Sequence, residues 1–197
     1  MKVYNKLDEI IKLDKSKLIL LSGTAGIGKS EVGLNIAKDL ALNNKRAVAI
    51  FSLETGIKEC VNKIIGDNKS LKHIGELAEA SIFIDDTPNI VVNYIEEKCR
   101  ELKQAQNIKF VLIDYLQLIN YENDIERVSK ELKALSQKLD LSILVLSQLS
   151  VNIENKRPTL EDLKDSKAVA DIADVVVFIY KEDNTTDVII AKNEMEM

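Results

Sequence analysis

The sequence predicts an α/β domain with a mostly parallel central β-sheet flanked by helices on both faces. Short apolar runs rich in Val, Ile and Leu alternate with longer amphipathic stretches. Most of the short runs are apolar throughout, which indicates strands that are covered on both sides. The chain has 197 residues, of which 46% are apolar and 30% charged, so it is long enough to fold around a core of its own.

The strands and helices are predicted from these patterns in chain order. Strands are expected at Lys17–Ser22, Ala47–Leu53, Ser81–Ile84, Lys109–Asp114, Ser142–Ser147, Asp174–Tyr180 and Asp187–Ala191. Helices are expected at Lys29–Leu42, Ile57–Ile65, Leu71–Ala80, Ile90–Gln106 and Asp124–Asp140. In the last helix, apolar residues recur at steps of three and four and form one stripe. The stretch from Ser150 to Ala168 shows no periodicity and is predicted to be the longest loop, of a length typical of functional loops.

Composition excludes several classes of protein. No apolar run approaches the roughly 20 residues that a membrane-spanning helix requires, and no apolar block marks a secretory signal in the first ten residues. We therefore expect no membrane partner. Cys60 and Cys99 lack the spacing of a zinc site and suit a reducing cytoplasm, where we expect the protein to act. We expect one domain over residues 1–197, with a short lead-in at 1–16 and a frayed tail at 192–197.

The residues that follow the first predicted strand form a phosphate-binding loop. The motif GxxxxGK[ST] is matched by Gly23, Thr24, Ala25, Gly26, Ile27, Gly28, Lys29 and Ser30. It follows an apolar strand and opens an amphipathic helix, which is the context that the motif requires. Glycines allow backbone amides to converge on phosphate oxygens. We expect Lys29 to reach the β- and γ-phosphates of ATP and the hydroxyl of Ser30 to bind Mg²⁺.

Three further polar residues stand where predicted strands end. Asp114 ends an apolar strand in the Walker B arrangement and is predicted to hold Mg²⁺ beside the phosphate loop. Glu54 follows the strand at 47–53, and it is either a base that polarises the attacking water or a solvated carboxylate at a strand end. Gln148 follows the strand at 142–147, where its amide can hydrogen-bond the γ-phosphate of ATP.

Together these segments resemble the RecA-like motor domain of the DnaB-family replicative helicases. The resemblance extends over most of the chain and follows the order of the family's motifs. The matching blocks are Gly23–Ser30, Phe51–Glu54, Ile84–Pro88, Val111–Ile119, Leu144–Leu149, Lys156–Leu163 and Asp171–Tyr180. The resemblance implies a RecA-like P-loop NTPase fold, with Glu54 as the hydrolytic base and Gln148 as the γ-phosphate contact. It also implies a hexameric ring that moves on single-stranded DNA, with ATP at each subunit interface.

The sequence departs from that family in ways that keep a second hypothesis open. Only 22 residues precede Gly23, whereas the family's helicases carry an N-terminal domain and a linker there. The family's Lys-x-Arg, whose arginine reaches the neighbour's ATP, corresponds to Lys192-Asn193-Glu194. We therefore expect Lys192 to lie near a nucleotide and ATP hydrolysis to be slow. Arg157 is either a substitute for the missing arginine or a solvated loop residue. The alternative is a stand-alone, weakly active paralogue that joins or regulates a helicase ring.

The segment that grips DNA in this family is electrically neutral here. The segment from Ser150 to Ala170 contains four basic and four acidic residues, and it has no aromatic side chain that could stack on a base. The net charge of the chain is −5. We expect weak, strongly salt-dependent binding of single-stranded DNA by the monomer. A RecA-like ATPase that serves another process, such as recombination or signalling, is a third and less favoured interpretation.

Overall fold

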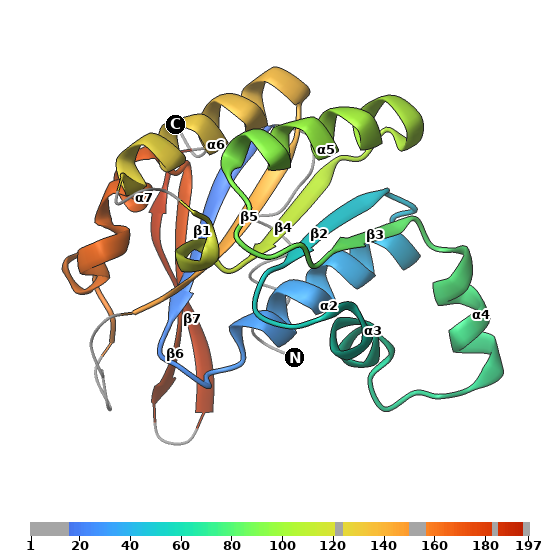
Figure 1. Ribbon diagram of the computed structural model, residues 1–197. Helices are drawn as coiled ribbons and strands as arrows, with labels where there is room; N and C mark the ends of the chain where they lie inside the picture. The colour runs from blue at the N-terminus through green and yellow to red at the C-terminus, as the bar shows by residue number, and fades with distance from the viewer. Residues whose placement is uncertain (1–15, 121–123, 150–156, 183–184, 195–197) are drawn as a thin grey trace.

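One sheet, in the order β3-β2-β4-β5-β1-β6-β7, runs through the described part of the chain (Figure 1). The computed structural model describes residues 16–120, 124–149, 157–182 and 185–194. The strands are β1 (Lys17–Gly23), β2 (Val48–Ser52), β3 (Ile82–Asp85), β4 (Phe110–Asp114), β5 (Ser142–Gln148), β6 (Val175–Glu182) and β7 (Thr185–Asn193). Strands β1 to β6 pair only in parallel with one another. The β7 strand pairs antiparallel with β6, because the short connection after Glu182 cannot cross over the sheet.

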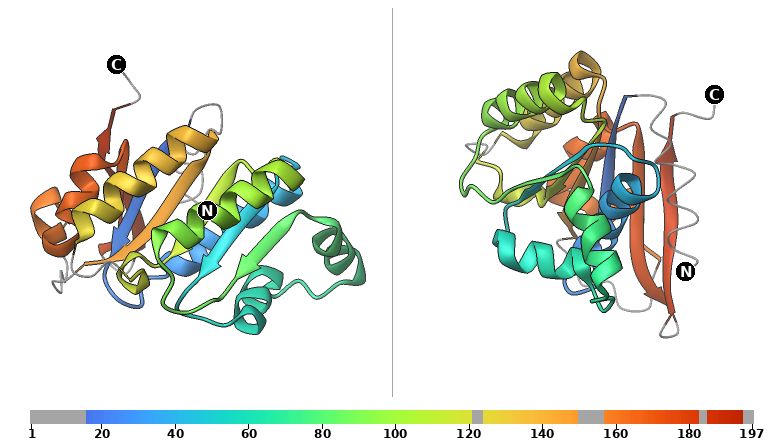
Figure 2. Two further views of the ribbon diagram at one scale, coloured as in Figure 1. Left: turned by 45° about the horizontal axis from the view of Figure 1, so that its top comes forward. Right: turned by 90° about the vertical axis from the view of Figure 1, so that its right-hand side faces the viewer.

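Helices cover both faces of this sheet (Figure 1, Figure 2). The α-helices are α2 (Lys29–Leu42), α3 (Ile57–Ile65), α4 (Leu71–Glu79), α5 (Val92–Gln106), α6 (Ile125–Leu139) and α7 (Lys167–Ile172). The 3₁₀ helices in the described part of the chain are η1 (Leu116–Leu118) and η2 (Leu160–Ser166). Apolar residues of α5, α6 and α7 pack on one face of the sheet, whereas α2 and α3 pack on the other. The mostly parallel sheet with helices on both faces is therefore confirmed.

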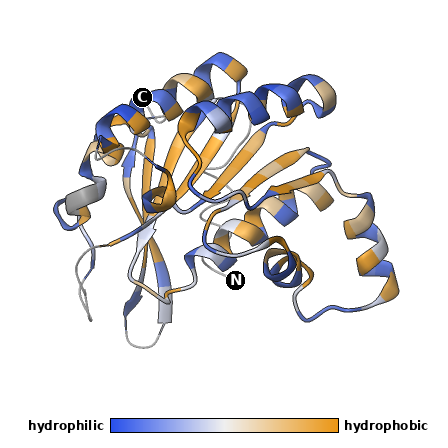
Figure 3. Ribbon diagram, viewed as in Figure 1, coloured by the Kyte–Doolittle hydropathy of each residue, from blue (hydrophilic) through white to orange (hydrophobic). Residues whose placement is uncertain are grey.

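The sheet has an apolar core on each of its two faces, and these cores explain the continuous apolar runs of the sequence. Every residue of β1, β2 and β4 is buried, because successive side chains of each strand enter the two helix layers in turn. Figure 3 shows hydrophobic strands between helices whose outer sides are hydrophilic. No helix in residues 16–120, 124–149, 157–182 or 185–194 is both long enough and apolar enough to cross a membrane.

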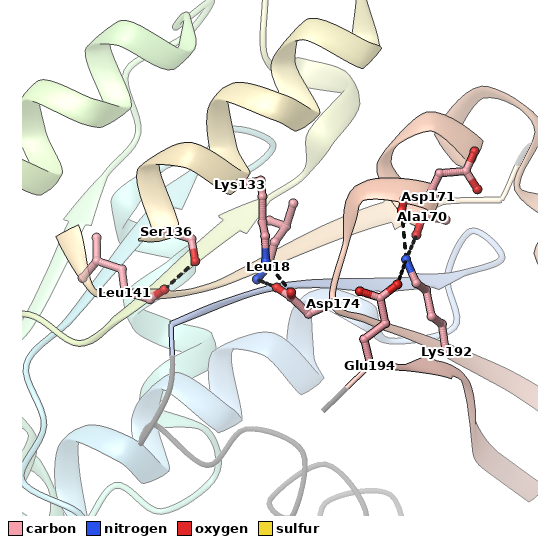
Figure 4. Close-up of polar contacts among 9 residues, drawn as sticks. All are labelled: Leu18, Lys133, Ser136, Leu141, Ala170, Asp171, Asp174, Lys192 and Glu194. Atoms are coloured by element: carbon pink, nitrogen blue, oxygen red, sulfur yellow. Dashed lines mark hydrogen bonds and ion pairs between the residues drawn. The ribbon is translucent and has the colours of Figure 1, made fainter. Parts of the chain in front are cut away.

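A partly buried polar cluster holds the start of β1 (Figure 4). The backbone N–H of Leu18 donates to Asp174 Oδ2 at 2.7 Å, and Asp174 also forms an ion pair with Lys133 of α6. The Asp174 side chain is 14% exposed, so water competes only weakly for these bonds. The cluster ties β1 to α6 and to the residue before β6, and it fixes the strand that carries the phosphate loop.

The prediction of a loop from Ser150 to Ala168 is wrong from Leu160 onward, because η2 and α7 occupy the residues from Leu160 to Ala168. Both helices are too short for a 3.6-residue period to emerge in the sequence. They are stabilised by burial of Leu163, Val169 and Ala170 against the rest of the core. The predicted frayed tail at 192–197 begins too early, because β7 extends to Asn193. Residues 150–156 of the predicted loop, residues 1–15 of the lead-in and residues 195–197 of the tail lie outside the described residues.

Candidate functional site

The phosphate loop joins β1 to α2 at the carboxyl edge of the sheet. Gly26 and Gly28 have φ angles of 69° and 95°, a left-handed conformation that glycine adopts without the strain caused by a Cβ atom. Gly28 is the N-cap of α2, and a glycine has no side chain that could accept from the first amides of the helix. The first amides of α2 are therefore available to an anion, and the helix dipole favours negative charge there.

Lys29 lies on the loop that it follows. Its ammonium donates to the carbonyl oxygens of Gly23 at 3.0 Å and Thr24 at 2.8 Å. Burial lowers the pKa of Lys29, and the negative charges of Asp114 and Glu54 oppose that shift. A phosphate group, with its full negative charge, is a stronger acceptor for the ammonium than these carbonyl groups are.

Asp114 stands at the end of β4, opposite Ser52 of β2 in register, and is 4% exposed. Burial raises the pKa of its carboxyl above the ordinary value of 3.8, with a further contribution from the charge of Glu54, while a hydrogen bond with Ser30 opposes the shift. A buried carboxylate beside a hydroxyl and a phosphate loop has the donor set that suits Mg²⁺, which commonly takes one or two carboxylates together with substrate oxygens. No group of three His, Cys, Asp or Glu side chains in the described ranges could hold a metal alone.

We expect Asp114→Asn to stabilise the nucleotide-free protein while it weakens Mg²⁺-dependent nucleotide binding. Because the folded-state pKa is raised, ionised Asp114 costs stability at neutral pH, and the neutral amide removes that cost. The cost is absent below the ordinary pKa and grows as pH rises through the folded-state pKa. Thermal melts in EDTA should show a higher Tm for the variant at pH 7 and a smaller gap near pH 4. An equal or lower Tm at pH 7 would contradict this assignment.

The β5 strand lies between β1 and β4 and brings Gln148 between the two motifs. Gln148 pairs in register with Gly23, and the next residue, Leu149, donates its N–H to Gly23 O at 3.1 Å. Glu54 lies two residues beyond the end of β2. Because β2, β4, β5 and β1 are successive parallel neighbours, the residues that follow them meet at one edge of the sheet.

A cavity of about 700 Å³ opens at this edge. The predicted residues that line it are Ala25, Gly26, Gly28, Lys29, Ser30, Glu54, Asp114 and Gln148. Gly23, Thr24 and Ile27 belong to the loop but do not line the cavity. The structure thus brings together an anion-binding loop, an ammonium, a hydroxyl with a buried carboxylate, a second carboxylate and an amide, which suits a magnesium-bound triphosphate.

Sequence reasoning missed the far wall of the cavity, which is formed by α2 and α3. Lys63 near the end of α3 lines it and forms an ion pair with Glu59 at 2.9 Å. The hydrogen bond with Glu59 raises the pKa of Lys63, and the charges of Asp114 and Glu54 contribute to the shift. Lys63 stands nine residues after Glu54, a spacing that carries no motif. Only the packing of α3 beside α2 returns it to the cavity.

Two predicted nucleotide contacts lie away from this cavity. Arg157 forms an ion pair with Glu182 at the end of β6 at 3.2 Å. Figure 4 shows Lys192 at the end of α7, where its ammonium donates to Ala170 O and Asp171 O at 3.2 and 2.9 Å and contacts Glu194 at 3.0 Å. Neither residue lines the cavity, and both roles stay predictions.

Comparisons with known proteins agree with this arrangement. A family model described as "DnaB-like helicase C terminal domain" matches residues 2–74 and 66–196. Replicative DNA helicase DnaC of Bacillus subtilis and replicative DNA helicase DnaB of Geobacillus stearothermophilus are each 33% identical over 229 residues, covering 96% of this chain. The chain spans about half the length of these relatives, 50% in both cases.

Solved structures show the same relationship. One of them, the structure of an ATPase domain, matches with a TM-score of 0.80 and 29% identity, over 91% of this chain and 78% of that one. A DnaB-like replicative helicase, solved in a study of its interactions with primase, also has a TM-score of 0.80 and 29% identity, over 92% of this chain and 53% of its own. The chain therefore has the RecA-like fold of these ATPase domains and belongs to the family of DnaB-like helicase C-terminal domains.

Proposed function

We propose that this chain is the motor domain of a DnaB-like replicative helicase, which binds and hydrolyses ATP to drive translocation on single-stranded DNA and duplex unwinding. The observation that carries the proposal is the convergence, at one cavity, of the phosphate loop, Asp114, Glu54 and Gln148. These residues lie at or just beyond the carboxyl ends of four neighbouring parallel strands, and each has the side chain that its part of the chemistry requires. Family membership supports the same conclusion.

The chemistry follows from the residues of the cavity. The amides of the phosphate loop and the ammonium of Lys29 would bind the phosphate oxygens. Mg²⁺ held by Ser30 and Asp114 would neutralise charge on those oxygens. Glu54 would orient a water and accept its proton as the oxygen attacks the γ-phosphorus and the bond to the bridging oxygen breaks. Gln148 would donate to a γ-phosphate oxygen and lose that contact when phosphate leaves.

Single-turnover hydrolysis of ATP tests this proposal directly. The wild-type chain, Lys29→Ala and Glu54→Gln are each mixed with less ATP than protein, in the presence of Mg²⁺. We expect measurable hydrolysis by the wild type and losses in both variants, of the sizes argued in the Discussion. Equal rates in all three proteins would exclude this cavity as the site of an ATPase.

We expect Lys63→Gln to reduce preference for ATP over ADP. The side chains of Lys63 and Glu59 are 37% and 60% exposed, so their ion pair is weak. Lys63 can therefore leave Glu59 and bind a phosphate instead. The affinity for a non-hydrolysable ATP analogue should fall roughly tenfold, as expected for one partly solvated charged hydrogen bond, while the affinity for ADP changes little. Calorimetry measures both affinities. Lys58→Gln, on the exposed side of the same helix, is the matched control, and equal behaviour of the two variants would contradict this role.

We propose that the working unit is a ring of six copies, or of this chain with a related helicase subunit, in the cytoplasm. The similarity to DnaB-like replicative helicases supports the ring, and two buried free cysteines suit a reducing compartment. The overall charge of −5 indicates that single-stranded DNA binds weakly to one copy and gains affinity only where several copies line a channel.

A regulatory partner of a helicase ring is the second candidate function. It is favoured by Glu194, which occupies the position that corresponds to the family's arginine finger and forms an ion pair with Lys192. A carboxylate there would repel the γ-phosphate of a neighbouring site, and arginine fingers contribute about 10³–10⁵ in rate. Size measurements with and without an ATP analogue separate the two functions. A hexamer formed by this chain alone, with DNA-stimulated turnover, would exclude the regulatory role.

A further inference from the structure

A small, largely buried polar cluster lies next to Gln148, which lines the cavity, and it joins three segments that are distant in sequence. Gln117 of η1 lies three residues after Asp114, and its side-chain amide donates to Ser147 Oγ of β5 at 3.0 Å. The same nitrogen lies 3.4 Å from the carbonyl oxygen of Gln148 and 3.5 Å from Ser166 Oγ. Ser147 and Ser166 are also hydrogen-bonded to each other at 2.5 Å. We refer to Gln117, Ser147 and Ser166 as the serine–glutamine cluster.

The cluster contacts two segments that border the cavity, the end of β5 at Gln148 and the residue before the phosphate loop. The Gln117 amide touches the backbone of Gln148, the residue whose side chain faces the cavity. The carbonyl oxygen of Ser147 accepts from Ser22 Oγ at 3.2 Å, directly before the phosphate loop. Ser166 is the last residue of η2 and the N-cap of α7. A shift of the β5 end therefore reaches η2 and α7 through these hydrogen bonds.

One atom of the cluster is unsatisfied. The Gln117 side-chain oxygen is buried and is the single buried side-chain N or O atom without a hydrogen-bond partner in the part of the chain that the structure describes. Ser147 and Ser166 are 0% and 1% exposed, so little water competes for the hydroxyl groups. A serine hydroxyl both donates and accepts, and Gln117 can therefore bond the pair through its nitrogen or, with the amide rotated, through its oxygen. The structure shows the first arrangement, and the second would turn the amide oxygen toward the carbonyl oxygen of Gln148 and lose that contact. The position of Gln148 can therefore select between the two, which is what coupling between sites requires.

We propose that Gln117 is a positioning residue that couples occupation of the γ-phosphate position to the η2–α7 segment, an inference that rests on the proposed ATP-binding function. When Gln148 engages the γ-phosphate, its backbone is held in place. The Gln117 amide is then fixed in one arrangement, and through Ser166 the junction of η2 and α7 is ordered. With ADP, Gln148 is released and the junction is less ordered.

Hydrogen exchange of the peptides that cover 160–172 tests this coupling. The full chain is measured with a non-hydrolysable ATP analogue and with ADP, and binding is monitored in parallel by calorimetry. For the wild type, we expect exchange about tenfold slower with the analogue than with ADP, within the usual range of coupling between sites. For Gln117→Leu, we expect the analogue still to bind and the difference to fall below about twofold.

Two further variants keep the test decisive. Ser166→Ala removes one hydroxyl of the cluster and should have the same effect, and it carries the test if Gln117→Leu does not fold. Ser136→Ala is the matched control, because Ser136 of α6 is equally buried but donates to the carbonyl oxygen of Leu141, away from the cavity (Figure 4). If either variant binds the analogue and its 160–172 peptides are protected from exchange as strongly as in the wild type, the inference is wrong. The proposed function would not be affected by that result. An absence of nucleotide binding by the wild type would overturn both the inference and the proposed function.

Discussion

Replacement of Glu54 by Gln is expected to abolish most ATP hydrolysis while nucleotide binding is retained. Glu54 is exposed at the cavity wall, two residues beyond β2, where it can reach a water but makes no contact that the fold depends on. The amide keeps the shape of the side chain and cannot accept a proton from water. Because general-base catalysis contributes about 10²–10⁴ in rate, the single-turnover rate constant should fall by that factor.

The matched control for Glu54 is Glu97→Gln on the exposed surface of α5, which removes the same charge far from the cavity. It should leave the rate unchanged. Calorimetric binding of the ATP analogue by Glu54→Gln should be equal to or tighter than in the wild type, because one negative charge near the phosphates is lost. A Glu54→Gln rate within twofold of the wild type would show that another group activates the water, and Glu54 would then be a solvated strand-end residue.

The second large effect is the loss of nucleotide affinity in Lys29→Ala. The ammonium lies against the loop, on Gly23 O and Thr24 O, at the point where the β- and γ-phosphates would bind. Truncating one partner of a hydrogen-bonded charge pair costs about 2–5 kcal/mol, which corresponds to roughly 30- to 5000-fold in affinity. Titration of each protein with the ATP analogue measures the loss.

Lys58→Ala on the exposed side of α3 controls for the loss of one positive charge. Thermal melts of nucleotide-free Lys29→Ala should show a folded protein, because the hydrogen bonds of Lys29 go to carbonyl oxygens of its own loop and join no distant segments. If the folded variant binds the analogue as tightly as the wild type, the triphosphate does not lie on residues 23–30, and the mechanism proposed for this cavity would be wrong.

Most elements were predictable from sequence because their signals are local. The helices at Lys29–Leu42 and Ile57–Ile65 begin and end where the periodicity of their apolar residues does, and the strands differ from prediction by no more than two residues at either end. The phosphate loop is equally local, since eight consecutive residues contain the whole motif. Segment 160–172 was missed because its helices are short and are held by burial of Leu163 and Val169, which no local pattern records.

The candidate site was only partly predictable for the same reason. Asp114, Glu54 and Gln148 could be proposed singly because each follows an apolar strand, and the parallel sheet explains why they share an edge. Lys63 could not be found, because its place depends on how α3 packs beside α2. Gln117 gave no signal either, since the partners of its half-buried amide come from segments about 30 and 49 residues away along the chain.

The amino-acid sequence by itself determined the class of fold, the phosphate loop and the family to which the chain belongs, because these depend on short runs and their order. Tertiary structure alone decided the strand order that sets β5 between β1 and β4, the far wall of the cavity and the intramolecular partners of Lys192 and Arg157. These features arise from contacts between residues remote in sequence. Such contacts are selected by packing and by the pairing of buried polar groups. Neither the packing nor the pairing can be inferred from a single segment of the sequence.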